Sequence, residues 1–145
     1  MNWKRITVGG LVSAVFTFVF AGVAGLLVTA RIYMGMMQRL HLTMPFSTAA
    51  ILWDVTASLI SGLSVALLYA AFRPRFGAGP KTALLAGCAF WVVSAINIGY
   101  QVDLGMIPLS DGVILCAQGL VMWLGAALIA GAIYKEKAAA QAAAA

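Results

Sequence analysis

Two ionisable residues, Arg31 and Asp54, stand beside or within stretches of sequence that are otherwise apolar. Placing an aspartate at the centre of a membrane-spanning helix costs about 2.5 to 3.5 kcal/mol on insertion scales, so a carboxylate there is a functional candidate. A carboxylate paired with a cation stays ionised, whereas one without a partner can take up and release protons. Asp54 is therefore the first residue to which we assign chemistry, with Arg31 as its expected cation.

Three side-chain amides accompany this pair, and all five residues are expected towards the outer side of the membrane. The predicted polar layer comprises Arg31, Asp54, Asn97, Gln101 and Gln118. It has three interpretations: a buried ion pair with interhelical hydrogen bonds that sets helix register, a site for a solute or a proton open to the outside, or contacts with lipid headgroups. The residue types alone leave all three open.

A second set of residues has the donor atoms that bind copper. Met34, Met37, His41 and Met44 are spaced three, four and three apart, so a helix there would place three thioethers and one imidazole on one side. Such soft ligands select Cu(I). Methionine is also a common apolar filler, and a helix lying at the membrane surface shows the same stripe without any metal. These four residues are weak candidates, and we expect no metal and no cofactor.

The sequence shows no catalytic machinery. It has no Cys-x-x-Cys, no phosphate-binding glycine loop, no serine nucleophile motif and no His-Glu pair. We therefore assign no catalytic residue and expect a protein that is not an enzyme.

The elements that must position these residues are four long apolar stretches, at about residues 7–33, 47–72, 82–100 and 112–134. Each exceeds or approaches the roughly 20 helical residues needed to cross a hydrocarbon layer. The composition, with 63% hydrophobic and 9% charged residues and a mean hydropathy of +1.01, excludes a water-soluble globular domain. We predict an all-α membrane protein, a bundle of four transmembrane helices within residues 1–137, followed by a low-complexity alanine-rich tail at 138–145.

Basic residues cluster at one side of this predicted bundle. Those on that side are Lys4, Arg5, Arg73, Arg75, Lys81, Lys135 and Lys137, whereas Arg31 and Arg39 lie opposite. Short cytoplasmic loops retain lysine and arginine, so both termini and the middle loop are expected in the cytoplasm. The net charge of +5 is scattered beside membrane edges, where anionic headgroups attract it, and does not indicate a nucleic-acid partner.

The middle loop reads Arg-Pro-Arg-Phe-Gly-Ala-Gly-Pro-Lys over residues 73–81, and its prolines and glycines are expected to end one helix and begin the next. With the Trp-Lys-Arg start and the Ile-Tyr-Lys-Glu close, this segment resembles small, uncharacterised four-span bacterial inner-membrane proteins. The resemblance implies a bacterial inner membrane and supplies no activity, cofactor or catalytic residue.

Small residues repeat along the helices at the spacing that lets helices approach closely in lipid. The predicted packing residues are Gly10, Ala14, Ser58, Gly62, Ala66, Gly87 and Gly125. Together with the missing catalytic motifs, they favour an accessory, assembly or structural subunit of a larger membrane complex, or a homo-oligomer. The expected partners are the lipid bilayer and other membrane subunits or a second copy. The alternatives are a small-solute or proton-coupled transporter using Asp54 and Arg31, and a Cu(I)-handling membrane protein.

Overall fold

The computed structural model describes residues 2–42 and 48–134 of the chain. Its elements are α1 (Trp3–Ala24), the π-helical segment η1 (Gly25–Thr29), α2 (Ala30–Arg39), α3 (Thr48–Phe76), α4 (Pro80–Asp103) and α5 (Leu109–Ile133). The first three are continuous, so these residues form four helices that are long and apolar enough to cross a membrane. The all-α class and the four long apolar helices are confirmed.

The first helical rod is longer than the predicted 7–33 and runs over 37 residues from Trp3 to Arg39. It begins where the Asn2 side chain accepts a hydrogen bond from the Arg5 backbone N–H, at 3.3 Å. It ends in a Schellman turn, in which His41 has φ 52° and the Leu42 N–H bonds back to the Met37 carbonyl at 2.9 Å. At 1.5 Å per residue the rod measures about 55 Å, so it extends well beyond a hydrocarbon layer of about 30 Å.

The turn between α3 and α4 is built by the middle-loop residues. α3 continues through Pro74 to Phe76, because a proline in the last turn removes only one backbone hydrogen bond before the helix ends. Gly77 and Gly79 then adopt φ values of +83° and +139° that other residues rarely reach. The Thr82 hydroxyl donates to the Gly77 carbonyl at 2.8 Å, and Pro80 occupies the first turn of α4.

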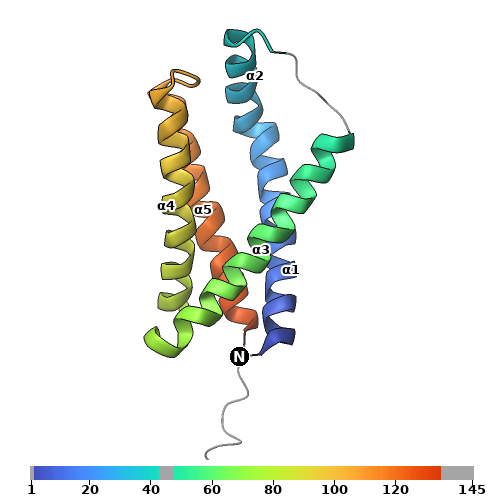
Figure 1. Cartoon of the computed structure of the whole chain (residues 1–145), viewed down its shortest axis with the longest axis vertical. Helices are drawn as coiled ribbons and strands as arrows, with labels where there is room; N and C mark the ends of the chain where they lie inside the picture. The colour runs from blue at the N-terminus through green and yellow to red at the C-terminus, as the bar shows by residue number, and fades with distance from the viewer. Residues whose placement is uncertain (1, 43–47, 135–145) are drawn as a thin grey trace, which may run out of the picture.

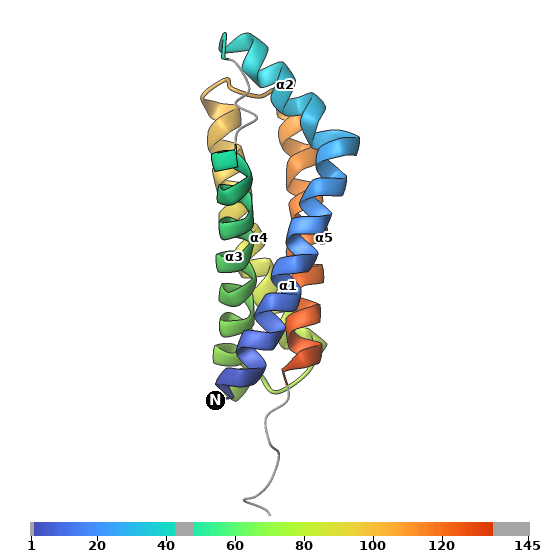
Figure 2. The same cartoon turned by 90° about the vertical axis from the view of Figure 1, so that its right-hand side faces the viewer.

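The first rod, α4 and α5 stay together along the bundle, whereas α3 diverges from them at one end (Figures 1 and 2). We call the end that carries the N-terminus, Tyr134 and the 77–79 turn the basic end, since Lys4, Arg5, Arg73, Arg75 and Lys81 lie there, and the other the far end. α4 and α5 run side by side, whereas α3 crosses the bundle obliquely and diverges from α4 towards the far end.

Small residues bring the helices together near the basic end. A Cβ atom on Gly62 would overlap the backbone of Gly10 and Ala14, and one on Gly10 would lie 2.8 Å from the Cα of Leu63. Between α4 and α5, a Cβ on Gly87 would lie 2.8 Å from the carbonyl oxygen of Trp123. This is the close approach that helix association in lipid requires.

The remaining predicted packing residues are less uniform. Ala14 and Ala66 are each 2% exposed, and Gly125 lies against the ring of Phe16. Ser58, one turn further towards the far end than Gly62, is only half-buried. The decrease in burial along α3 follows from its departure from the bundle.

Two apolar clusters hold the described residues together, and they differ in which helices they include. The first contains Ile6, Val65, Ala83 and Ala127 among others, so α1, α3, α4 and α5 all contribute. The second lies at the far end and joins Ile32, Ile107 and Leu115, with Met36, Ile98 and Val102 packed against them. Among the described residues α3 contributes nothing to this second cluster, which explains why it is free to diverge.

Candidate functional site

The far half of α3 contains a stretch that packs against no other helix on any side within the described chain. Residues 51–56, which cover more than one complete turn and therefore every side of the helix, are all exposed. Val65 on the same helix is 0% exposed. The transition from a buried to an exposed helix occurs within about three turns. Asp54 lies in the exposed half.

Asp54 nevertheless occupies the face of α3 that forms the core at the basic end. It precedes Val65 by about three full turns, so the two side chains leave the helix in nearly the same direction. Counted from Phe72, where the basic end begins, Asp54 is about 27 Å along the helix, less than the roughly 30 Å of a hydrocarbon layer. Because α3 is tilted relative to the long axis of the molecule, the distance from Phe72 to Asp54 along that axis is shorter than this length (Figure 1). Asp54 is thus an exposed carboxylate within a helix that is long and apolar enough to cross a membrane.

The structure does not bring Arg31 to Asp54. The contact of Gly10 with Leu63 fixes the register of the two rods, and Arg31 lies about 30 Å along its rod from that contact, against about 13 Å for Asp54. Both residues are exposed, and within residues 2–42 and 48–134 Asp54 has no ion-pair partner. The buried pair expected from the sequence does not form within one chain, because the first rod continues as a helix past the level of Asp54.

The amides of α4 bond to each other rather than to a neighbouring helix. Gln101 donates to the Asn97 side-chain oxygen at 3.1 Å, one helical turn apart. Asn97 is exposed, yet it follows the fully buried Ala86 by about three turns and so shares its face of α4. Asp54 and Asn97 therefore both continue the core faces of their helices, at a level where α3 and α4 have separated (Figure 1).

Gln118 makes the interhelical hydrogen bond that the sequence suggests for it. Its side-chain oxygen accepts from the Thr29 hydroxyl at 3.0 Å, which joins η1 to α5. Sequence reasoning missed Thr29, because a π-helical turn inserts one extra residue and shifts the periodicity on which such a pairing depends. It also missed Ser13, a fully buried residue that donates to the Ala126 carbonyl at 2.8 Å.

The methionine and histidine residues do not form a continuous stripe. Met34 is exposed and Met37 is half-buried on α2, but the helix ends at Arg39 and His41 lies in the turn beyond it. Met44 lies outside the described residues. Across the described parts of the chain, no three His, Cys, Asp or Glu side chains gather in a group able to hold a metal ion.

These observations define a class: an all-helical chain with four helices long and apolar enough to cross a membrane, which is the structure expected of a multi-pass membrane protein. Comparison with protein-family models, curated proteins and solved structures gives no match for this chain. The function must therefore be argued from the residues themselves, above all from Asp54 and the exposed half of α3.

Proposed function

We propose that this chain is a non-enzymatic, multi-pass protein of the bacterial inner membrane that serves as an accessory, assembly or structural subunit of a larger membrane complex, or as a homo-oligomer. The single observation that carries the proposal is the exposed Asp54 in a stretch of α3, residues 51–56, that is exposed on every side of the helix. In this proposal both termini and the 77–79 turn face the cytoplasm, since lysine and arginine concentrate at that end.

The argument is energetic. Intramembrane charges almost always face the interior of a bundle or a water-filled cavity, because a lipid-facing carboxylate is unfavourable. The cost is about 2.5 to 3.5 kcal/mol at the helix centre and decreases towards the ends, and Asp54 lies within the first two turns of α3. A helix from another subunit, or from a second copy, that packs against the far half of α3 would shield Asp54 and supply a hydrogen-bond donor or a cation. The amide of Asn97, which is exposed on α4, offers a second polar contact.

The test is gentle detergent extraction followed by mass spectrometry of the chains that co-purify, for the wild type and for Asp54→Ala. Loss of one intramembrane polar contact, worth ~0.6 kcal/mol on average, lowers partner or self-association by about threefold or more. Asp103→Ala is the matched control, because Asp103 is an exposed acid at the end of α4. A wild-type protein that emerges alone and monomeric would remove the basis of this proposal.

A second candidate is a small-solute or proton-coupled carrier that uses Asp54. It is favoured by one observation: the exposed Asp54 has no ion-pair partner among the described residues. Asp54→Asn keeps a side chain able to hydrogen-bond but cannot exchange a proton. In proteoliposomes, a carrier with this substitution loses its transport of solute or protons. A subunit with the same substitution keeps most of its association with the partner chain or second copy. Equal flux for Asp54→Asn and wild type would eliminate the carrier.

A further inference from the structure

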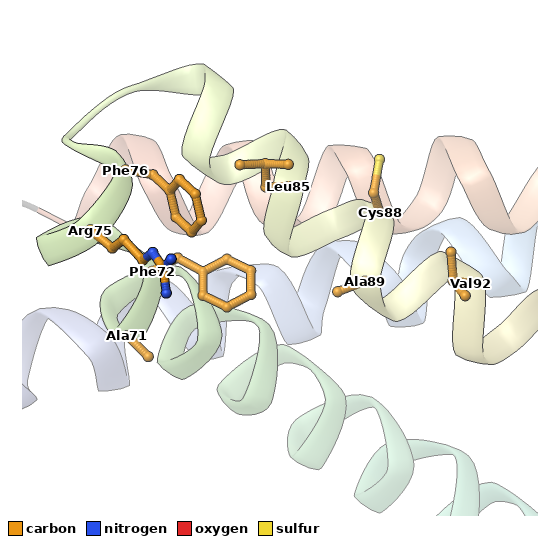
Figure 3. A pocket seen from close by; sticks show the side chains of 8 residues that line it. All are labelled: Ala71, Phe72, Arg75, Phe76, Leu85, Cys88, Ala89 and Val92. Carbon is orange, nitrogen blue, oxygen red and sulfur yellow. The ribbon is translucent and has the colours of Figure 1, made fainter.

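A groove lies at the basic end between the last turns of α3 and the first half of α4 (Figure 3). Its volume is about 580 Å³, within the range of roughly 300 to 1,000 Å³ typical of small-ligand sites. The lining residues are Ala71, Phe72, Arg75, Phe76, Leu85, Cys88, Ala89 and Val92. Arg75 contributes the one charge, and the other side chains are apolar.

The charge lies at the end of the groove that meets the membrane surface. Arg75 is in the last turn of α3, next to the turn that joins it to α4. Its Cζ atom is 5.9 Å from the centre of the Phe76 ring. The Phe76 ring, which itself packs against Phe72 with centroids 5.8 Å apart, thus lies beside the cation. Leu85, Ala89 and Val92 extend the apolar wall away from it along α4.

The neighbouring residues of the turn are engaged with other parts of the fold, whereas Arg75 contacts the adjacent Phe76 ring. Arg73 stacks on the ring of Tyr134 at 5.4 Å, and the Tyr69 hydroxyl accepts from the Gly79 N–H at 3.3 Å. Thr82 is 1% exposed and closes the turn. Arg75 is exposed and forms no hydrogen bond or ion pair within the described residues. Its five donors are available to an outside acceptor.

We propose that this groove binds an anionic phospholipid of the leaflet at the basic end, with its phosphate on Arg75 and an acyl chain along Phe72, Leu85 and Val92. Two features support an anionic phospholipid: the positive charge of Arg75 and the position of the groove at the basic end of the helices. A planar guanidinium recognises phosphate through paired N–H bonds. Basic pockets between membrane helices on this side bind the headgroups of anionic lipids, and acyl chains are the natural occupant of an apolar wall at this depth.

The experiment is native mass spectrometry of the full chain with phosphatidylglycerol or phosphatidylcholine of identical acyl chains. We expect one phosphatidylglycerol to be retained about fivefold more than phosphatidylcholine, the ratio that corresponds to the ~1 kcal/mol of one basic residue near an anionic surface. Arg75→Gln abolishes this preference, and Arg75→Lys, which keeps the charge without the paired donors, restores part of it. Lys81→Gln is the control: Lys81 is exposed at the same end but does not line the groove.

A second variant tests the apolar wall independently of charge. Ala89→Phe fills the groove and lowers retention of phosphatidylglycerol even with Arg75 intact, while an unchanged elution volume shows that the fold persists. The proposal is overturned if both lipids are retained equally, if Lys81→Gln weakens binding as much as Arg75→Gln, or if Ala89→Phe changes the oligomeric state and not the lipid retained. The inference rests on the proposed membrane insertion alone. Failure of the lipid preference leaves the Asp54 test untouched, whereas a chain absent from the membrane fraction defeats both.

Discussion

Gly62 shows how much a single residue decides in this bundle. At its crossing with Gly10 and Ala14 the two helix backbones are in direct contact, so even one methyl group has no room. Backbone cannot rotate away as a side chain can, and the helices must separate to admit the methyl group. The cost of such overpacking is typically 1 to 3 kcal/mol.

We therefore expect Gly62→Ala to lower the free energy of unfolding in detergent micelles by about 1 to 3 kcal/mol. Gly22→Ala is the matched control, because a Cβ at Gly22 meets nothing within 4 Å. Alanine is the better helix former, so the control is neutral or slightly stabilising. Equal unfolding energies for the two variants would show that the Gly10–Gly62 crossing does not limit the approach of α1 and α3.

At the scale of the helices, hydropathy predicted the four spans but not their full lengths. The first was expected over 7–33 and runs from Trp3 to Arg39, because α2 carries Arg31 and Arg39 and continues as a helix beyond the apolar part. A hydropathy pattern ends where the residues become polar, whereas the helix ends where its carbonyls are capped, here at His41. For the same reason α3 passes the proline that was expected to stop it.

The candidate site was predictable in composition and not in geometry. Asp54, Asn97 and Gln118 were identified as polar residues among apolar ones, and that required only the sequence. The residues that they contact depend on where the rods cross and at what angle. Helical periodicity gives the face on which a residue lies, and it gives neither the crossing point nor the crossing angle. The angle of α3 separates Asp54 from the bundle, and the π-helical turn η1 brings Thr29 to Gln118. The groove at Arg75 was missed because its lining combines two helices that meet only in the folded chain.

The whole molecule is asymmetric along its long axis. At the basic end all four rods share one apolar cluster, and Tyr69, Thr82 and Tyr134 close the structure with buried side chains. At the far end α2, α4 and α5 share the second cluster, which in the described chain excludes α3. The closed end and the open end thus have different tasks in our proposals. The closed end provides stability and a lipid site, and the open end provides the surface for association.

This division depends on which end lies in the cytoplasm, and labelling of single cysteines determines that. In a Cys88→Ser, Cys116→Ser background, Ala78→Cys in the turn at the basic end and Leu104→Cys at the far end are both exposed positions outside the apolar spans. Lysine and arginine at the basic end predict that a membrane-impermeant maleimide added to intact cells labels Leu104→Cys, and labels Ala78→Cys only after the membrane is opened. Labelling of Ala78→Cys in intact cells would reverse the orientation and place the Arg75 groove in the outer leaflet. Equal labelling of both positions from one side would mean that α4, the rod between them, does not cross the membrane, which contradicts the four-span arrangement.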